Sequence, residues 1–489
     1  MKLKVKEVKL STGGPLIAIL TQKDARLLDL SPGDRVLIKR PKVKKEITCV
    51  VDISSMGIKN GEIGFFEEAF KALKAKSKQQ VEVNLAEKPK SIYYIKKKLE
   101  GIELSGKEIN EIVKDIIANK LSEVETTYFI AACYTKGMKL REAAKLTQSI
   151  VDNGETLKFK SKVLVDKHCI GGVPGNRTTM LVVPIMAALG YKMPKTSSRS
   201  ITSPAGTSDT MEVLAPVSLS TKKIKKVVNK TGGCMAWGGA VNLAAADDKL
   251  IKLRHDLSID PLGMMLASIM AKKKSVGSTH VLIDIPWGKG SKVANKKDAI
   301  KLKKLFIKIG KLLGMKVKVV MTDGTQPVGS GIGPALECSD VIAVLKGDGP
   351  NDLREKGVFL ATEMLKLLKV RRPKKKVLDI LDSGKAYKKF REIIIAQGGL
   401  KRPNIPSADL FYEYKATKAG KVKEINNKQI SKLARIAGAP DDKVAGMYLR
   451  VRVHNKVKKG HILFTLYAKS QTKLDNAKKY LKSIKPIIY

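Results

Sequence analysis

Residues 163–189 read VLVDKHCIGGVPGNRTTMLVVPIMAAL, and this stretch decides the fold of the central part of the chain. A short apolar run comes first, a segment with three glycines follows, and a second apolar run has the length of a helix. This order predicts a strand over 163–166, a glycine-rich loop and a helix over 177–189, the repeating unit of an α/β sheet. Lys167 follows the predicted strand directly, at the edge where open α/β sheets place their binding sites.

The glycine-rich loop has two interpretations. Glycines let the main chain approach a ligand, and N–H groups at a helix N-terminus attract anions, so the loop around Gly172 is a candidate phosphate cradle. Alternatively, the glycines serve only a tight turn and close packing of strand against helix. For this loop alone the two interpretations are evenly balanced. The stretch lacks the GxxxxGK[ST] pattern, so ATP is not indicated.

A second stretch, TSSRSITSPAGTSDTMEVLAP (196–216), favours the phosphate cradle. Eight of the thirteen residues from Thr196 to Ser208 are serine or threonine, and Arg199 lies among them. Hydroxyl groups and a guanidinium fork match phosphate oxygens. Thr207 or Ser208 can cap a short helix over 209–214. A flexible polar loop is the alternative, but such loops seldom lie between core strands.

A third stretch, LRHDLSIDPLGMMLASIMAKKK (253–274), predicts a helix that begins with an Asp260 cap and a proline. Asp260, Met264, Ser268 and Lys272 step by four residues and would share one face of that helix. An acid, a hydroxyl and an ammonium then point the same way. The alternative, which would be preferred for this stretch alone, is that Asp260 only caps the helix and Lys272 lies on the surface.

Two more glycine-rich turns follow predicted strands. They are IDIPWGKGSKV (283–293), with Lys289 and Lys292, and TDGTQPVGSGIGPALE (322–337). Three such strand ends suggest a ligand with more than one anionic group. The histidines show no metal-binding spacing, and no nucleotide-cofactor fingerprint is present, so neither a metal nor a cofactor is expected.

The rest of the chain predicts a multi-domain α/β and α+β protein. We expect a β-rich, barrel-like module over 1–86, since LKVKEVKL and RVLIKR alternate with period two. A helical domain over 87–160 follows, with capping boxes at 105–108 and 122–125 and with 243–273 packing into it. An α/β phosphate-binding domain over 161–375 comes next. RRPKKKVLD (371–379) would be a surface connection to a C-terminal α+β domain over 376–489, whose end alternates like an antiparallel sheet.

Composition excludes some classes of protein. No run is long enough to span a membrane, and MKLKVKEVKL is not a signal peptide, so we expect a cytoplasmic protein. The net charge of +48 raises the possibility of nucleic-acid binding. Most of the positive charges are lysines spread along the whole chain, however, and aromatic residues make up only 5%. A lysine-rich solvated surface is therefore the preferred interpretation, and specific nucleic-acid binding is not expected.

Taken together, DKHCIGGVPGN, SSRSITSPAGTSD, SIDPLGMMLASIMAKKK and KLARIAGAPDDKVAGMYL resemble the thymidine phosphorylase family of nucleoside phosphorylases. The resemblance covers about 90–489. The additional β-rich module in front, with GGVPGNRTT and SRSITSPAGT, is most similar to the archaeal AMP phosphorylase branch of that family. The resemblance implies phosphorolysis of AMP, and also of CMP and UMP, to free base and ribose 1,5-bisphosphate. Inorganic phosphate is then a co-substrate, and because relatives form dimers through the helical domain, the resemblance implies a homodimer or a larger homo-oligomer.

The resemblance also implies roles for individual residues. Asp260 is implied as the proton donor to the leaving base. Lys167, Ser197, Arg254 and Lys272 match positions that bind phosphate or base in the pyrimidine relatives. Where the family usually has serine this chain has Cys169, whose thiol is a weaker hydrogen-bond donor. The implied nucleotide contacts are Gly172, Ser198, Arg199, Ser200, Ile201, Thr202, Ser203, Thr207, Ser268 and Lys292.

Such chemistry needs a proton for the base and donors for the phosphate. A positioned acid typically accelerates bond cleavage by about 10²–10⁴-fold, provided that it carries a proton. We therefore expect Asp260 to lie in a dry or anionic setting, in a cleft between the helical and α/β domains that closes over the substrate. A thymidine or pyrimidine-nucleoside phosphorylase that yields a pentose 1-phosphate is the alternative function, and a nucleic-acid-binding protein is the alternative from another class.

Overall fold

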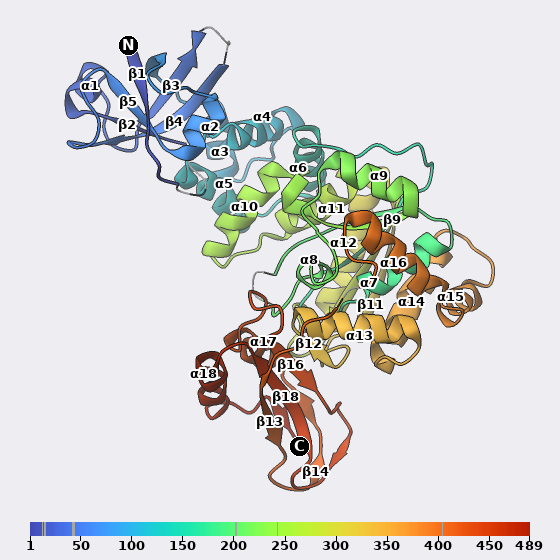
Figure 1. Cartoon of the computed structure of the whole chain (residues 1–489). Helices are drawn as coiled ribbons and strands as arrows, with labels where there is room; N and C mark the ends of the chain where they lie inside the picture. The colour runs from blue at the N-terminus through green and yellow to red at the C-terminus, as the bar shows by residue number, and fades with distance from the viewer. Residues whose placement is uncertain (12, 14–15, 42–44, 201–202, 242, 403) are drawn as a thin grey trace. The chain divides into compact units, whose positions relative to one another are not determined.

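The computed structural model describes the chain except for residues 12, 14–15, 42–44, 201–202, 242 and 403. It contains two compact units (Figure 1). The first consists of Met1–Asn153 and Ala245–Met265, and the second of Gly154–Ala244 and Leu266–Tyr489. The four predicted domain boundaries remain a prediction.

The N-terminal part of the first unit is a closed six-stranded barrel in the order β1-β5-β2-β4-β3-β6. This confirms the predicted β-rich, barrel-like module. Alternating burial in β1, with Leu3 and Val5 inside, explains the period of two in the sequence. Two short helices, α1 (Gln22–Leu27) and α2 (Glu67–Leu73), accompany the strands. The strands are β1 (Lys2–Glu7), β2 (Ile17–Leu20), β3 (Arg35–Arg40), β4 (Lys45–Ile53), β5 (Glu62–Phe65) and β6 (Gln80–Leu85).

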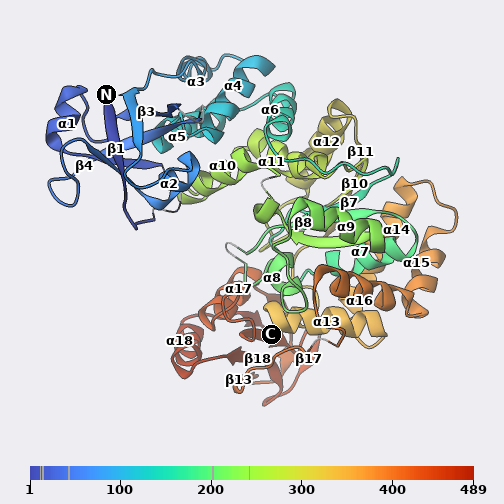
Figure 2. The same ribbon diagram turned by 45° about the horizontal axis from the view of Figure 1, so that its top comes forward.

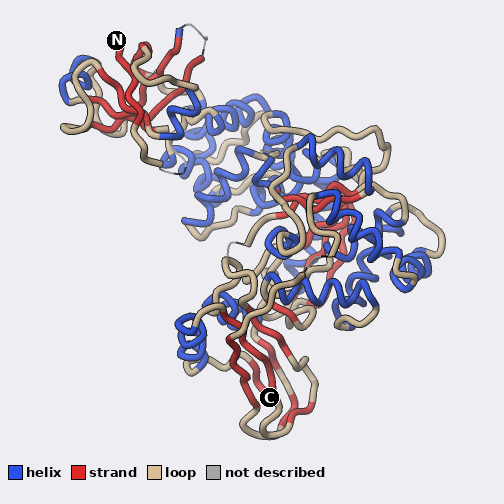
Figure 3. Tube along the Cα trace, viewed as in Figure 1, coloured by secondary structure: helices blue, strands red, loops and turns tan. Residues whose placement is uncertain are grey.

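In the described part of the first unit, helices accompany the barrel, and Figure 3 draws them in blue beside its red strands. Ser105 and Ser122 form the predicted capping boxes at the starts of α4 and α5. Lys249 of α10 donates to the carbonyl of Ile116 at 2.8 Å and so holds α10 against the end of α4. The helices are α3 (Ser91–Leu99), α4 (Gly106–Ile117), α5 (Glu123–Thr135), α6 (Leu140–Asp152) and α10 (Ala245–Asp256).

The second unit is built on parallel strands, visible from two directions in Figures 1 and 2. Strands β11-β10-β7 form one sheet and β8-β9 another, and the parallel bridge between Leu164 and Lys192 joins them. The combined order is β11-β10-β7-β8-β9, so the chain changes direction across the sheet between β7 and β10. The strands are β7 (Val165–Cys169), β8 (Met193–Ser197), β9 (Gly233–Trp237), β10 (His280–Trp287) and β11 (Lys316–Asp323).

Helices connect and cover these strands. The predicted helix after the first glycine-rich loop is α7, and it belongs to the largest hydrophobic cluster of the described residues together with α13 to α16. A short 3₁₀-helix (Gly238–Val241) follows β9. The helices are α7 (Thr179–Ala188), α8 (Thr207–Met211), α9 (Thr221–Thr231), α11 (Leu262–Ser275), α12 (Lys296–Leu312), α13 (Pro334–Lys346), α14 (Asn351–Leu367), α15 (Pro373–Asp382) and α16 (Lys385–Gln397).

One connection was predicted wrongly. RRPKKKVLD does not form a surface connection, because Pro373 starts α15 and Val377 is buried in the cluster that contains α7. Proline is favoured in the first turn of a helix, and the lysines that follow lie on its exposed side. The basic composition thus described one face of a core helix.

The C-terminal part carries the predicted antiparallel sheet, in the order β12-β16-β18-β13. The strand β12 comes from the glycine-rich stretch 322–337, far earlier in the chain. These elements confirm the predicted α/β and α+β class. They are β12 (Gly331–Ile332), β13 (Leu410–Lys415), β14 (Gly420–Lys421), β15 (Glu424–Ile425), α17 (Asn427–Ile436), β16 (Gly446–Leu449), β17 (Lys456–Val457), β18 (Ile462–Ala468), α18 (Gln471–Leu481) and β19 (Ile487–Ile488).

Within the described part of the chain, no helix combines the length and apolar character that crossing a membrane requires.

Candidate active site

The carboxyl ends of β7 and β10 form the topological switch point of the sheet, where ligands bind in open α/β folds. The two predicted loops that follow these strands meet there. Gly172 has φ +91°, and a Cβ atom on it would lie 2.3 Å from the main-chain nitrogen of Lys292. Only glycine allows this approach, so the structure brings together Gly172 and Lys292, two of the predicted nucleotide contacts.

The sequence predicted that Lys167 directly follows the strand. In the structure, Lys167 lies inside β7. β7 extends to Cys169 because Lys167 and the next two residues pair in register with Leu282–Asp284 of β10. The Lys167 side chain is buried, and its Nζ donates to Thr178 Oγ1 at 2.8 Å, at the start of α7. Burial lowers the pKa of Lys167, while the Asp284 charge opposes this effect. Thr178 was not predicted, although it opens the helix after the glycine-rich loop.

More charges than the sequence suggested are buried around these strands. Lys273 donates to Asp166 Oδ2 at 2.6 Å, and Lys195 Nζ lies 3.4 Å from Asp166 Oδ1. Thr322 donates to Asp284 Oδ1 at 2.6 Å, and Lys356 Nζ lies 3.7 Å from its Oδ2.

Counted with Lys167, four ammonium groups face two carboxylates in this interior. Burial lowers the pKa of Lys167 and lowers that of Lys273 to about 7, so an anion bound here would favour their charged forms.

His168 and Cys169 follow Lys167 in the same strand. Burial and the surrounding lysines hold the pKa of His168 well below its usual range, so its ring is neutral. Burial raises the pKa of the Cys169 thiol, which accepts a hydrogen bond from Asn176 Nδ2 at 3.4 Å. Neither side chain therefore adds charge to the site.

The hydroxyl-rich stretch begins at the end of β8. The buried hydroxyl groups of Thr196 and Ser197 have no hydrogen-bond partner among the described residues. Ser198 is exposed, whereas Ser200 and Ser203 are half-buried. Ser203 Oγ donates to the carbonyl of Ala205 at 3.0 Å, and the Ser200 hydroxyl donates to the carbonyl of Ser203. Ile201 and Thr202, also predicted contacts, lie outside the described residues.

Arg199 already has anionic partners. It donates to both carboxylate oxygens of Glu212, at 2.6 and 2.8 Å, and to Asp209 at 3.3 Å. Its guanidinium also lies 4.9 Å from the ring centre of Trp237. These carboxylates raise the pKa of Arg199, with the Glu212 hydrogen bond as the main cause. A phosphate group has to compete with Glu212 for this side chain.

Thr207 opens α8, and Gly206 occupies the cap position in place of the predicted Thr207 or Ser208. The side chain of Asp209 accepts from the main-chain nitrogen atoms of Ser200 and Gly206, at 2.7 and 2.8 Å. Arg177 approaches Thr207 at 3.4 Å while it pairs with the buried Glu337. The loop is therefore folded around its own acid, a feature that spacing alone did not indicate.

The last glycine-rich stretch, 322–337, was one of the three strand ends that suggested an anionic ligand, but its glycines serve packing. A Cβ atom on Gly331 would lie 2.3 Å from the carbonyl oxygen of Leu336, and one on Gly333 would lie 2.4 Å from that of Ala445. The N–H groups of Ser330 and Gly331 donate to Asp340 Oδ2 at 2.6 and 2.7 Å. The protein's own carboxylate thus occupies this loop.

The predicted acid lies in the first unit. α11 begins at Leu262, where the carbonyl of Pro261 accepts from Met265 at 2.9 Å, so Asp260 precedes the cap and does not share a helix face with Ser268. Instead, Asp260 Oδ1 accepts from Arg254 at 3.0 Å. The Asp260 side chain is 41% exposed and that of Arg254 8%. The setting is thus not dry, contrary to expectation, and Asp260 Oδ1 is an acceptor in this state.

Ser268 and Lys272 both lie on α11, as predicted, one turn apart. Ser268 is buried and Lys272 half-buried. The next residue, Lys273, is the lysine that pairs with Asp166. A run of three lysines at the end of a helix gave no sign of which one faces inward.

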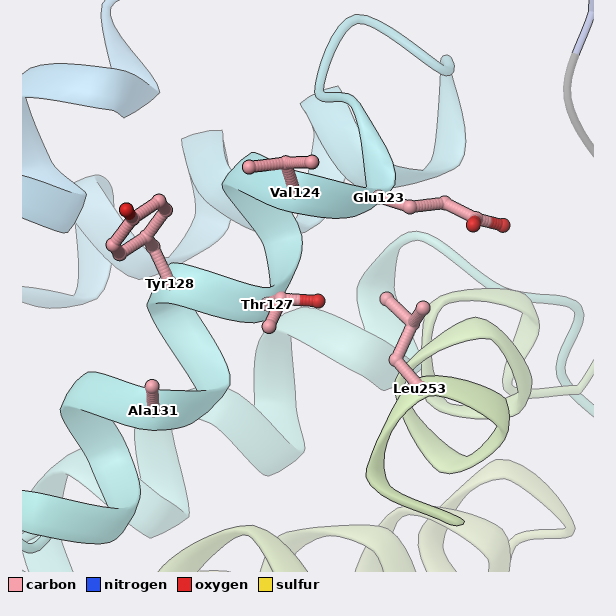
Figure 4. Close-up of a pocket in the computed structure, with 6 residues that line it drawn as sticks. All are labelled: Glu123, Val124, Thr127, Tyr128, Ala131 and Leu253. Carbon is pink, nitrogen blue, oxygen red and sulfur yellow. The ribbon is translucent and has the colours of Figure 1, made fainter. Parts of the chain in front are cut away.

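A different hollow, about 400 Å³, opens in the first unit (Figure 4). Its walls come from α5 and α10 and are mainly apolar, so it does not suit a phosphate. None of the predicted site residues lines it. Among the described residues, no group of three His, Cys, Asp or Glu side chains could hold a metal ion. The residues that line the hollow are Glu123, Val124, Thr127, Tyr128, Ala131 and Leu253.

Comparisons with known proteins agree with this architecture. Residues 92–154 match the helical bundle domain of the glycosyl transferase family, and residues 161–387 match its α/β domain. Residues 421–487 match the pyrimidine nucleoside phosphorylase C-terminal domain. The solved anthranilate phosphoribosyltransferase of Thermus thermophilus has a TM-score of 0.52 at 17% identity, covering 62% of this chain and 98% of that one, which indicates a shared fold alone.

Individual relatives match over most or all of the chain. The AMP phosphorylase of Thermococcus sibiricus is 44% identical over 100% of this chain and 97% of its own length. A putative thymidine phosphorylase of Legionella pneumophila (strain Paris) is also 44% identical, over 89% of this chain and 85% of its own length. The chain therefore belongs to the family of the AMP phosphorylases, within the glycosyl transferase family whose helical and α/β domains it carries.

Proposed function

We propose that the protein phosphorolyses AMP, and also CMP and UMP, to the free base and ribose 1,5-bisphosphate. An oxygen of inorganic phosphate attacks C1′ of the ribose while the bond to the base breaks. The base leaves with the bonding electron pair and takes up a proton. The observation that carries this proposal is the excess of lysine side chains over carboxylates in the interior around β7, β8 and β10.

This interior supplies what an attacking phosphate needs. Lys167 lies within β7. Thr196 and Ser197, whose hydroxyls have no hydrogen-bond partner among the described residues, end the neighbouring strand β8. Main-chain N–H groups of the Gly172 turn provide further donors. Fixed donors of this kind hold the nucleophile in line and stabilise the charge that develops, without reorganising during the reaction.

Asp260 is our candidate for the proton donor. A donor carboxyl must carry a proton, whereas Asp260 Oδ1 now accepts from Arg254. We therefore propose that substrate draws the Arg254 guanidinium away, which allows Asp260 to take up a proton. Ser268 and Lys272 are proposed contacts of the nucleotide.

Arg199 is our candidate for the 5′-phosphate of the nucleotide. A guanidinium that already holds the carboxylate of Glu212 in a fork can hold a phosphate in the same geometry. The sugar product then keeps one phosphate at C5 and gains one at C1. No cofactor or metal enters this chemistry.

The alternative is a nucleoside phosphorylase that acts on thymidine or another pyrimidine nucleoside. The relative from Legionella pneumophila that is named a putative thymidine phosphorylase is 44% identical, as is the one from Thermococcus sibiricus, although over 89% and not 100% of this chain. The test is to incubate the protein with phosphate and AMP, CMP, UMP, adenosine, thymidine or uridine in turn, and to follow the products by phosphorus NMR. A sugar with two phosphorus signals supports our proposal, and one with a single signal from a nucleoside supports the alternative.

We further expect a cytoplasmic homodimer or larger homo-oligomer. The apolar side chains of Val124 and Tyr128 are exposed on α5 and support an interface through the helical domain. Light scattering tests this expectation. Filter binding at two salt concentrations tests whether the net charge of +48 serves nucleic acid instead.

A further inference from the structure

Asp166 lies at the centre of a buried network in the second unit. Its Oδ2 accepts from Lys273 at 2.6 Å, and its Oδ1 accepts from the main-chain nitrogen of Lys167 at 2.7 Å. Lys195 Nζ lies 3.4 Å from Oδ1. Asp166 and Lys273 are almost completely buried, and Lys195 nearly so. One carboxylate therefore contacts three elements, namely its own strand β7, strand β8 and helix α11.

Each of these contacts is next to a residue that the proposed function uses. Lys167 follows Asp166 directly, Thr196 and Ser197 follow Lys195, and Lys272 precedes Lys273. The side chains of the network are buried, and so are the neighbouring Lys167 and Thr196, whereas Lys272 is half-buried. A shift in any of the three contacts displaces a proposed ligand of the substrate.

We propose that Asp166, through Lys273 and Lys195, is the positioning residue that fixes Lys167, the end of β8 and Lys272 relative to one another. The inference rests on the proposed function, because that function makes these three positions parts of one site. Asp166 does not touch the substrate. It acts through the main chain of β7 and through the two lysines.

A purely structural role explains the network less well. A buried ion pair contributes little net stability, because desolvation of the charges offsets their attraction, and apolar side chains of similar size pack as well or better. Charged hydrogen bonds are directional, however, and apolar contacts are not. A network that costs stability but fixes orientation is expected where a site must be held to within a fraction of an ångström.

The test compares two buried lysines. Lys273→Met removes the contact of α11 with Asp166 and keeps a similar volume. Lys98→Met is the matched control, because Lys98 is also buried and lies 2.9 Å from both carboxylate oxygens of Glu142, far in sequence from any proposed ligand. For each purified protein we would measure thermal unfolding, kcat and KM for AMP, and the Kd of inorganic phosphate by calorimetry.

We expect both variants to lose thermal stability, but only Lys273→Met to lose about 100-fold in kcat, as displacement by about 1 Å can cause. Phosphate binding should weaken in the same variant alone. Lys273→Arg, which restores a donor to Asp166, should recover most of the turnover. Lys195→Met, whose contact is longer, should show a smaller loss of the same kind.

Equal losses in the Lys273 and Lys98 variants, with unchanged kcat and phosphate affinity, would overturn the inference. Should Lys273→Met fail to fold, Lys195→Met decides, and wild-type kinetics there would equally overturn it. The phosphate titration needs no turnover. A wild-type protein without activity on any nucleotide would therefore sink the proposed function, while weaker phosphate binding by Lys273→Met would still support the positioning role.

Discussion

The glycine-rich segments 170–176 and 324–333 look alike in sequence, but their N–H groups have different partners. In the second segment, carboxylates of the protein accept from the loop. Asp352 accepts from Gly329 at 3.1 Å, Asp340 from Ser330 and Gly331, and Glu337 from Gly333 at 3.2 Å. In the first segment, no carboxylate of the described residues accepts from the main chain of 171–176, and Gly172 lies against the main chain of Lys292.

Glycine spacing therefore predicts a loop that binds an anion, but it does not show whether a carboxylate of the protein or a free ligand occupies the loop. The helix after the second loop contains Glu337 and Asp340 within its first two turns. The helix after the first loop, α7, has no acidic residue. A loop whose own helix supplies the carboxylate is closed by the protein, whereas a loop without one is left for a ligand. This signal was present in the sequence.

The largest effect we predict separates the binding of phosphate from the cleavage of the bond. Asp260→Asn cannot donate a proton as an acid does, so kcat should fall by about 10²–10⁴-fold. The first loop should still bind inorganic phosphate with wild-type affinity, as calorimetry can measure. A comparable loss of phosphate affinity would mean that Asp260 belongs to the anion site, and a mere loss of thermal stability would leave it a structural residue.

Gly172→Ala should break the first loop. The new Cβ atom meets Lys292 at 2.3 Å in a conformation with φ +91°, so the two loops have to separate and turnover should fall by about 100-fold. Gly171→Ala is the control, because its φ of +89° imposes similar strain but nothing lies within 4 Å of its Cβ. If both variants lose the same activity, backbone strain and not the approach to Lys292 is the cause.

Asp340→Ala should affect stability alone. It leaves the buried N–H group of Gly331 without an acceptor, which costs about 1–3 kcal/mol of unfolding free energy in urea titrations. Burial raises the pKa of Asp340 to about 6, so its charged form is unfavourable in the folded protein. Above that pH, the loss of unfolding free energy should therefore lie at the lower end of this range. Added phosphate that restores the variant's stability would show that the second loop, too, can take a free anion.

Much of the fold could be predicted from the sequence, because it depends on local patterns. Period-two alternation predicted the barrel strands, and Ser105 and Ser122 predicted two helix starts that the structure has. The site was predicted less well, since its charges pair across long separations. The contact of Asp166 with Lys273 joins residues 107 positions apart, and nothing local marks Lys273 over Lys272. The strand boundary at Lys167 was missed because pairing with β10 overrides its charge.

Arg199 is intermediate between the two loops. It already pairs with a carboxylate of the protein, as the second loop does, but this carboxylate, Glu212, is exposed enough for a ligand to replace it. Glu212 is only half-buried, and Lys443 also approaches it at 3.6 Å, so it has another partner when Arg199 leaves. Arg199→Ala should weaken the binding of AMP by about 10-fold, the low end for a charge-assisted hydrogen bond, because Glu212 must first be displaced. The affinity for adenosine should not change.

Glu212→Gln keeps the size of the side chain but removes its charge, and it should tighten AMP binding. Calorimetric titrations with both ligands measure these affinities, and equal losses for AMP and adenosine in Arg199→Ala would assign the 5′-phosphate to another part of the site.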